Sequence, residues 1–480
     1  MKPSLPALLI CALTAVPTAL QAQASVRPPN FVVILGEGAG WNTTPVPMDD
    51  TVPASKSDLL QTPALARLAN EGMRFTNFYA ASARCTPSRA AIFTGKSPAQ
   101  LHMTFINDGR RRDGDAGADP GLKLIAPAAL MELPAGELTI GDVLKRAGYA
   151  TAHFGKWHVG RVSPSQHGFD ENDGPTGNEG PDRNENPNPG EAFGMTERGI
   201  AFMAKQAKGG KPFYLQMSHY PGRRGEADAR PETYAAVRQR AGANDARRVA
   251  SAAILEDMAS AIGEVLKKLD ELGIANNTYV IYTTDHGAQG RNANRPLAGG
   301  KGTLLEGGIR VPFIIRGPGI KAGTYSRVPA TDVDLLPTIA ALARVTAPLP
   351  AGLEGGSLIP ALAARGPVKR PREELFFHFP HYDEGNDGPV SAVILGHDKL
   401  IKNYETGAVH LYDLSKDLAE QHDLAGESPQ KAADLDRRLV EYLKTVNAQL
   451  PLLNPAYDPS KARPLDERRG GPRKGPGAPP

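Results

Sequence analysis

One cysteine stands in a segment whose residue types could activate it. The sequence has two cysteines: Cys85 lies in the segment 85–89 (CTPSR), and Cys11 lies in an apolar run near the start. Pro87 predicts that a helix begins close to Cys85, because proline is favoured in the first turn of a helix. Arg89 then lies about one turn further along. The positive end of a helix and a guanidinium group together favour an anion at residue 85.

Polar side chains also follow directly after several segments that are predicted to be strands. In an open parallel sheet the ligand site lies beyond the carboxyl ends of the strands, so these side chains are expected to lie close together. Carboxylates, lysines and histidines in one place can hold a divalent cation, bind an anion and transfer protons. The residues concerned are Glu37, Lys156, His158, His219, Asp285 and His286.

These side chains require a sheet whose strands alternate with helices. The continuous apolar run 31–35 is typical of a strand buried on both faces of a parallel sheet. Further strands are predicted at 73–79, 149–154, 212–217 and 279–283. Helices are predicted at 63–72, 139–148 and 247–272. The alternation predicts an α/β fold with a doubly wound sheet.

The part of the chain after residue 369 has a different pattern, typical of a small antiparallel sheet with one helix. The strands are predicted at 374–379, 392–395 and 399–401, and the helix at 435–447. We therefore expect a large domain at 25–369 and a smaller α+β domain at 370–459. Residues 460–480 carry six Lys/Arg against two Asp/Glu, with many Gly and Pro, which predicts a disordered basic tail.

The start of the chain predicts export. Met1-Lys2 is basic, an apolar run follows, and small residues offer cleavage sites after Ala22 or Ala24, so residues 1–24 read as a secretory signal peptide. We expect a periplasmic or extracellular protein without stable membrane insertion. Removal of the signal peptide leaves Cys85 as the only cysteine, which excludes an internal disulfide. The net charge of +3 over 480 residues gives no electrostatic case for a nucleic-acid partner.

Segment 85–96 (CTPSRAAIFTGK) resembles the signature of the type I sulfatase family, C-x-P-S-R followed by T-G-[RK]. Segments 155–160 (GKWHVG) and 299–312 (GGKGTLLEGGIRVP) are similar to two further motifs of that family. The resemblance implies an alkaline-phosphatase-like fold, in which helices sandwich a large mixed, mainly parallel sheet. It also implies that a separate maturation enzyme oxidises Cys85 to formylglycine, an aldehyde whose hydrate is the nucleophile.

The resemblance assigns roles to the charged residues of the predicted site. Arg89 and Lys156 would face the nucleophile and the sulfate. His158 would take a proton when the sulfated intermediate breaks down. His219 and Lys301 would serve the oxygen of the leaving group. The second histidine that the family places after the proline is replaced here by Gly222.

The implied metal site departs from the family pattern. Asp285 and His286 resemble the second metal-binding segment, but the two adjacent aspartates of the first segment are Glu37 and Gly38 here. The implied ligands are Glu37, Cys85, Asp285 and His286, and the implied ion is Ca²⁺, with another divalent cation as the alternative. A water, a carbonyl group or one of the acids at positions 49 and 50 could replace the missing carboxylate.

Three more residues are candidates for substrate contacts. Asn178 lies where some sulfatases place a polar contact to the sulfate, and His378 and His381 could touch the sugar or aryl part. The predicted substrate is a sulfated carbohydrate or an aryl sulfate. Two alternatives stay open: a phosphonate or phosphodiester hydrolase of the same superfamily, and a non-catalytic binder of sulfated glycans.

Overall fold

The computed structural model describes residues 27–106, 119–178, 189–222, 225–242, 245–290, 293–383, 386 and 388–462. The predicted signal peptide lies outside these residues, and so does the predicted tail from residue 463 onward. Among the helices of the described part, none is both long and apolar enough to cross a bilayer.

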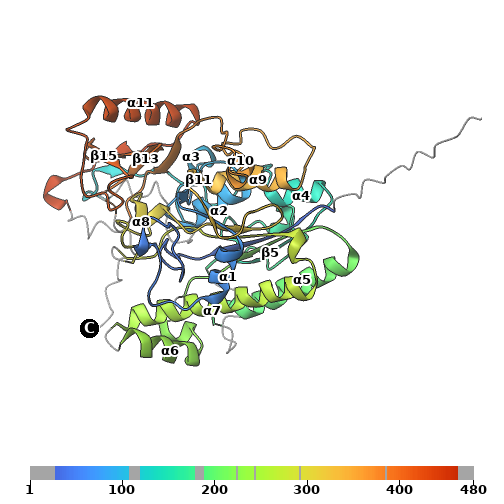
Figure 1. The fold of residues 1–480 in the computed structure, drawn as a ribbon. Helices are drawn as coiled ribbons and strands as arrows, with labels where there is room; N and C mark the ends of the chain where they lie inside the picture. Colours follow the sequence, from blue (N-terminus) through green and yellow to red (C-terminus); the bar gives the residue numbers. More distant parts are fainter. Residues whose placement is uncertain are drawn as a thin grey trace, which may run out of the picture.

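An eight-stranded sheet forms the centre of the molecule (Figure 1). The central strand β1 pairs in parallel with β7 on one side and β8 on the other. Only β9 runs antiparallel to its neighbours within this sheet, so the sheet is mixed but mainly parallel. In spatial order the strands are β10 (Thr324–Ser326), β2 (Met73–Phe75), β9 (Ile314–Arg316), β8 (Thr278–Thr284), β1 (Asn30–Gly36), β7 (Phe213–Ser218), β5 (Ala150–Gly155) and β6 (Glu171–Asn172).

Helices cover both faces of this sheet (Figure 1). Alternate residues of β1 enter two separate cores, because successive side chains of a strand point to opposite faces. One face carries α1 (Pro63–Glu71), α5 (Ala192–Gly209) and α7 (Ala246–Glu271), and α6 (Pro231–Ala241) packs on α7. The other carries α2 (Cys85–Thr94), α4 (Ile140–Arg146), α9 (Leu335–Leu342) and α10 (Ile359–Leu362). The predicted α/β architecture is confirmed.

A four-stranded antiparallel sheet follows near the C-terminus, and α11 (Pro429–Thr445) packs on it through a core that includes Leu400, Leu435 and Leu439. Its strands are β12 (Leu375–Phe379), β13 (Val390–Leu395), β14 (Asp398–Asn403) and β15 (Val409–Asp413). The smaller antiparallel sheet plus helix is therefore confirmed. Short elements complete the chain: α3 (Pro98–Leu101), α8 (Glu306–Ile309), and the strand pairs β3 (Phe78–Tyr79) with β11 (Ala330–Thr331) and β4 (Leu124–Ile125) with β16 (Leu452–Leu453).

The structure corrects two element boundaries. The predicted strand 73–79 is split into β2 and β3, which pair in different sheets, because Thr76 and Asn77 turn the chain and bond to the carbonyl groups of Ser326 and Arg327. The predicted helix 435–447 begins earlier, at Pro429, a residue that fits the first turn.

Candidate active site

The carboxyl ends of the parallel strands bring most of the predicted residues to one edge of the sheet. Glu37 follows β1, Lys156 follows β5, His219 follows β7 and Asp285 follows β8. Because β1 lies between β7 and β8, and β5 lies next to β7, these four positions are neighbours. The prediction that one sheet edge collects the polar residues therefore describes the geometry correctly.

Cys85 reaches this edge as the first residue of α2, with Arg84 as the N-cap. Pro87 is the third helical residue rather than the first, but it still lies in the first turn, where no intrahelical N–H bond is lost. The Ser88 hydroxyl accepts a bond from the backbone N–H of Ser82 at 3.1 Å and donates to the Ser82 carbonyl oxygen at 2.9 Å. These bonds fix the loop that enters the helix.

The Cys85 thiol is almost completely buried and lies among charged groups. Its Sγ is 3.3 Å from Glu37 Oε1, 3.2 Å from His286 Nε2 and 3.7 Å from Lys301 Nζ. Burial and the charge of Glu37 raise the pKa of the thiol, but Lys156, Lys301 and His286 outweigh them and hold this pKa well below its usual value. The site thus favours an anion at residue 85.

Arg89 donates hydrogen bonds to the carboxylates of both Glu37 and Asp285. Its Nε and Nη2 donate to Asp285 Oδ2 at 3.1 and 2.9 Å, and Nη2 also donates to Glu37 Oε2 at 3.0 Å. Its Nη1 donates to the Lys156 carbonyl oxygen at 2.6 Å, and Lys156 Nζ is 2.7 Å from Glu37 Oε2. The side chains of Arg89 and Lys156 are fully buried, so solvent screens these charges little.

Four side chains could together hold a divalent cation. Glu37, Cys85, Asp285 and His286 each offer one ligand atom, and these atoms lie within 4.8 Å of one another. Two carboxylates, an imidazole and a thiolate are donors that divalent cations accept. Burial and the charge of Glu37 raise the pKa of Asp285 to about 6. A cation between the two carboxylates would offset this repulsion, so the residues present fit the group.

The missing aspartate at position 38 has a local explanation. Gly38 has a φ of +58°, and a Cβ built there would lie 3.1 Å from Cε1 of His286. The imidazole of His286 therefore occupies the space into which a side chain at residue 38 would extend. Asp49 and Asp50 do not replace it, because Asp49 accepts bonds from Thr51 and Asp50 pairs with Arg327.

His158 and His219 flank the cluster as buried neutral imidazoles. Among the described residues, Nε2 of each has no hydrogen-bond partner. Burial, together with the charge of Arg89, lowers the pKa of His219 to about 3. Burial also lowers the pKa of His158, whose Nδ1 is 3.3 Å from the Thr86 hydroxyl oxygen. Each imidazole is able to accept a proton, or to donate one in the other tautomer.

Two of the three candidate substrate residues, His378 and His381, form their hydrogen bonds elsewhere in the protein. His378 is buried in β12, with Nδ1 2.6 Å from the Ser391 hydroxyl oxygen and Nε2 2.9 Å from the Gln449 carbonyl oxygen. Both ring nitrogens are thus engaged within the protein, which gives His378 a structural role. His381 is also buried, with Nε2 2.8 Å from the Thr104 hydroxyl oxygen. Asn178 is half-buried in the loop after β6.

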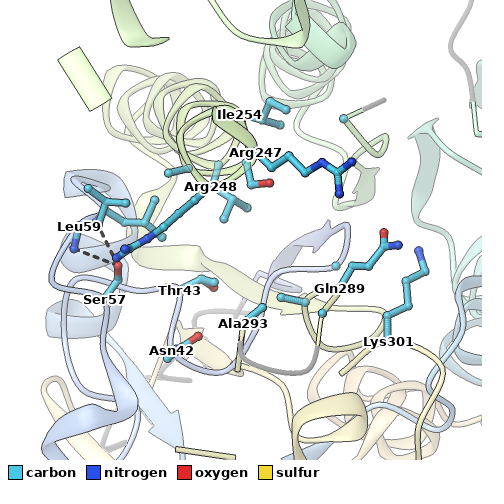
Figure 2. Close-up of a pocket in the computed structure, with 18 of the residues that line it drawn as sticks. Asn42, Thr43, Ser57, Leu59, Arg247, Arg248, Ile254, Gln289, Ala293 and Lys301 are labelled. Atoms are coloured by element: carbon cyan, nitrogen blue, oxygen red, sulfur yellow. Dashed lines mark hydrogen bonds between the residues drawn. The ribbon is translucent and has the colours of Figure 1, made fainter. Parts of the chain in front are cut away.

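A cavity of about 940 Å³ opens beside the cluster (Figure 2). Glu37, His286 and Lys301 line one part of it, and the N-terminal turns of α7 line another. The cavity contains residues that sequence reasoning missed, above all Arg247 and Arg248. The only signal for them was their position at the start of the predicted helix 247–272.

Fold and site together define an ester hydrolase of the alkaline-phosphatase-like class. Two family models match the chain: Sulfatase over residues 29–345, and N-sulphoglucosamine sulphohydrolase, C-terminal, over residues 300–449. The chain is 31% identical to human arylsulfatase A over 474 residues, covering 84% of each protein. The chain belongs to the sulfatase family and is a sulfuric ester hydrolase.

A further relative supports the family, and a solved structure supports the fold. Mouse N-acetylgalactosamine-6-sulfatase is 30% identical over 418 residues, covering 79% of this chain and 73% of that protein. The crystal structure of Ps i-CgsB superposes with a TM-score of 0.73 at 21% identity, covering 90% of this chain and 95% of the other. The second likeness shows a shared fold.

Proposed function

We propose that this protein is an exported sulfatase that cleaves sulfate esters with a formylglycine made from Cys85 by a separate maturation enzyme, assisted by a divalent cation. The observation that carries the proposal is the position of Cys85. It is the first residue of a helix and lies within 3.7 Å of Glu37, His286 and Lys301. A buried cysteine that served only for packing would not need these charged neighbours.

The charges around residue 85 suit a sulfate ester. The nucleophile must approach sulfur through a shell of oxygen atoms that carry negative charge. Lys156, Lys301 and Arg89 are positioned before the reaction starts, so they stabilise this charge without reorganisation. Glu37 and Asp285 would hold the cation together with His286, and when bound the cation would supply further positive charge near the nucleophile.

The aldehyde explains why a cysteine precursor is useful here. A hydrated formylglycine carries two hydroxyl groups on one carbon: one attacks sulfur, and the other later re-forms the aldehyde and expels sulfate. Lys301 would deliver a proton to the alkoxide oxygen of the leaving alcohol, and the neutral imidazole of His219 would donate a hydrogen bond to the same oxygen. His158 would take the proton from the second hydroxyl group. Both steps use imidazoles that burial keeps neutral.

The substrate proposed is a sulfated carbohydrate, with an aryl sulfate as the alternative. The relatives named above include an arylsulfatase and an N-acetylgalactosamine-6-sulfatase. Export is proposed from the apolar N-terminal segment of the sequence, and the division into domains at 25–369 and 370–459 is proposed from the change to antiparallel strands.

The test compares sulfate and phosphorus esters with one enzyme preparation. We expect the enzyme, made in a host that oxidises Cys85, to cleave 4-nitrophenyl sulfate faster than phenyl phosphonate or bis(4-nitrophenyl) phosphate esters. Cys85→Ala should retain less than about 10⁻⁴ of the activity, because the nucleophile is lost. Preferential cleavage of the phosphorus esters would overturn the proposal, as would a Cys85→Ala variant with full activity.

A further inference from the structure

The cavity beside the nucleophile carries more positive charge than a single sulfate ester requires. Its lining includes Arg247, Arg248, Arg295 and Lys301, against two acidic residues, Glu37 and Asp245. Both acids are already engaged. Glu37 contacts Lys156 and Arg89, and Asp245 accepts a bond at 3.0 Å from the backbone N–H of Arg248 as the N-cap of α7. The lining therefore carries a formal excess of positive charge, since four basic residues stand against two acidic ones.

The arginines also have no carboxylate partner elsewhere. Within the part of the chain that the structure describes, the side chains of Arg247, Arg248 and Arg295 form no ion pair, and all three residues are exposed. By contrast, Arg230 pairs with Asp257 and Arg370 pairs with Asp334. Exposed, unpaired guanidinium groups around a cavity are suited to an anionic ligand.

Arg247 has the orientation that such a ligand needs. Figure 2 shows its side chain extending from the start of α7 toward the part of the cavity where Gln289 and Lys301 lie, whereas Arg248 points to the opposite end, near Ser57. Lys301 Nζ is 3.7 Å from Cys85 Sγ, so the Lys301 end is the end at which a sulfate would react. A ligand held by Lys301 could therefore present a second group to Arg247.

The rest of the lining indicates what carries that second group. Asn42, Thr43, Ser57 and Ser251 offer hydroxyl and amide groups beside aliphatic side chains such as those of Leu59 and Ile254. No Phe, Tyr or Trp is among the described residues that line the cavity. Polar side chains suit the hydroxyl groups of a sugar, while a flat aryl ring would find no aromatic face. At about 940 Å³ the cavity also has room for much more than one sulfate.

We infer that the natural substrate is a sulfated oligosaccharide with a second anionic group, a carboxylate or another sulfate, on the part that enters this cavity. Arg247 binds that second group and so determines specificity. The inference rests on the proposed sulfatase function. The inference goes beyond the proposed function by stating that the alcohol part of the ester is itself an anion.

The experiment compares a singly charged substrate with doubly charged ones. Enzyme with verified formylglycine is assayed on 4-nitrophenyl sulfate and on a panel of disaccharides that are sulfated at each hydroxyl in turn and carry a uronic acid. For the disaccharide that is cleaved, Arg247→Ala should lower kcat/KM by about 10-fold to 100-fold, mainly through KM, since a charge-assisted hydrogen bond is lost. The same variant should change kcat/KM for 4-nitrophenyl sulfate less than about two-fold.

Two controls separate binding from general damage. Arg238→Ala removes an exposed arginine of α6 outside the cavity and should leave both activities unchanged. The same disaccharide with its carboxyl group reduced to an alcohol should be cleaved equally by the wild type and Arg247→Ala. An equal loss on both substrate classes, or a wild type that cleaves 4-nitrophenyl sulfate but no doubly charged disaccharide, would refute the inference. A converted wild type that cleaves no sulfate ester at all would refute the proposed function as well.

Discussion

At residue 37 a single carboxylate lies within 3.5 Å of several basic side chains and of the thiol. Glu37 approaches Lys156 at 2.7 Å, Arg89 at 3.0 Å and Cys85 at 3.3 Å, and it is also one of the four candidate metal ligands. Its Oε2 faces Arg89 and Lys156, and its Oε1 faces the thiol of Cys85 and the ammonium group of Lys301. Where the family pattern has two aspartates, Glu37 and Gly38 therefore keep one carboxylate and leave out the other.

The proposed cation can be tested at His286. Chelation by EDTA should abolish sulfatase activity, and Mn²⁺ or Ca²⁺ should restore it. Replacing the imidazole with an amide oxygen in His286→Asn should weaken Mn²⁺ more than Ca²⁺, because calcium prefers oxygen ligands. The increase in melting temperature on adding each cation to the apoenzyme gives a second readout. Full activity after exhaustive chelation would contradict the metal site.

At the scale of elements, a buried ionic network joins the small sheet to the loop that carries Lys301. Lys399 of β14 lies 2.9 Å from Glu306 Oε1 and 2.8 Å from Glu420 Oε1, and all three side chains are inaccessible to solvent. Glu306 is the first residue of α8 and also accepts a bond from Arg310 at 2.6 Å. The sheet thus holds the segment that begins five residues after Lys301.

Breaking this network should cost stability and activity together. Lys399→Met leaves the buried carboxylate of Glu420 without a cation and leaves Glu306 with Arg310 alone, so we expect a loss of about 3 to 5 kcal/mol in the free energy of unfolding. The matched control is Lys402→Met in the same strand, whose partner Asp436 is partly exposed; it should lose less than about 1 kcal/mol. Urea denaturation and sulfatase assays measure both effects. Equal losses in the two variants would show that the network has no special role.

The sequence could predict the elements that have one dominant signal. The continuous apolar run of β1 and the long amphipathic α7 were predicted within two residues of their bounds, and strand ends located Glu37 and Asp285. The split of segment 73–79 could not be predicted, because it depends on carbonyl groups some 250 positions away. The cavity was missed for the same reason. The residues that line it together with Arg247 are distant in the sequence and come together only in the fold.

At the scale of the whole molecule, buried neutral histidines should make stability depend on pH. Burial lowers the pKa of His153 to about 3, of His219 to about 3 and of His378 to about 4. In the unfolded chain these groups take up protons below about pH 6.5. The unfolded state therefore binds more protons than the folded state, so stability falls as the pH drops from about 6.5 toward 4.

His153 offers the cleanest test because it lies outside the reacting cluster, packed against Phe93 and Trp157. Each such histidine contributes about 1.4 kcal/mol per pH unit to the slope of unfolding free energy below pH 6.5. His153→Gln should reduce that slope by this amount, whatever its effect at pH 7. The exposed His422→Gln serves as the control and should leave the slope unchanged. Urea denaturation at pH 7.0, 6.0 and 5.0 measures the change of the unfolding free energy with pH. Equal slopes for His153→Gln and the wild type would contradict the argument.

The central claim is that residue 85 acts as an aldehyde, and mass spectrometry of the tryptic peptide 85–89 tests it most directly. The protein should be purified from its own host and assayed for sulfatase activity in the same preparation. We predict a peptide lighter than the thiol form by about 18 Da, the difference between CH₂SH and CHO, with activity proportional to the converted fraction. A peptide that carries only the unmodified thiol, from protein that nevertheless cleaves sulfate esters, would contradict the account.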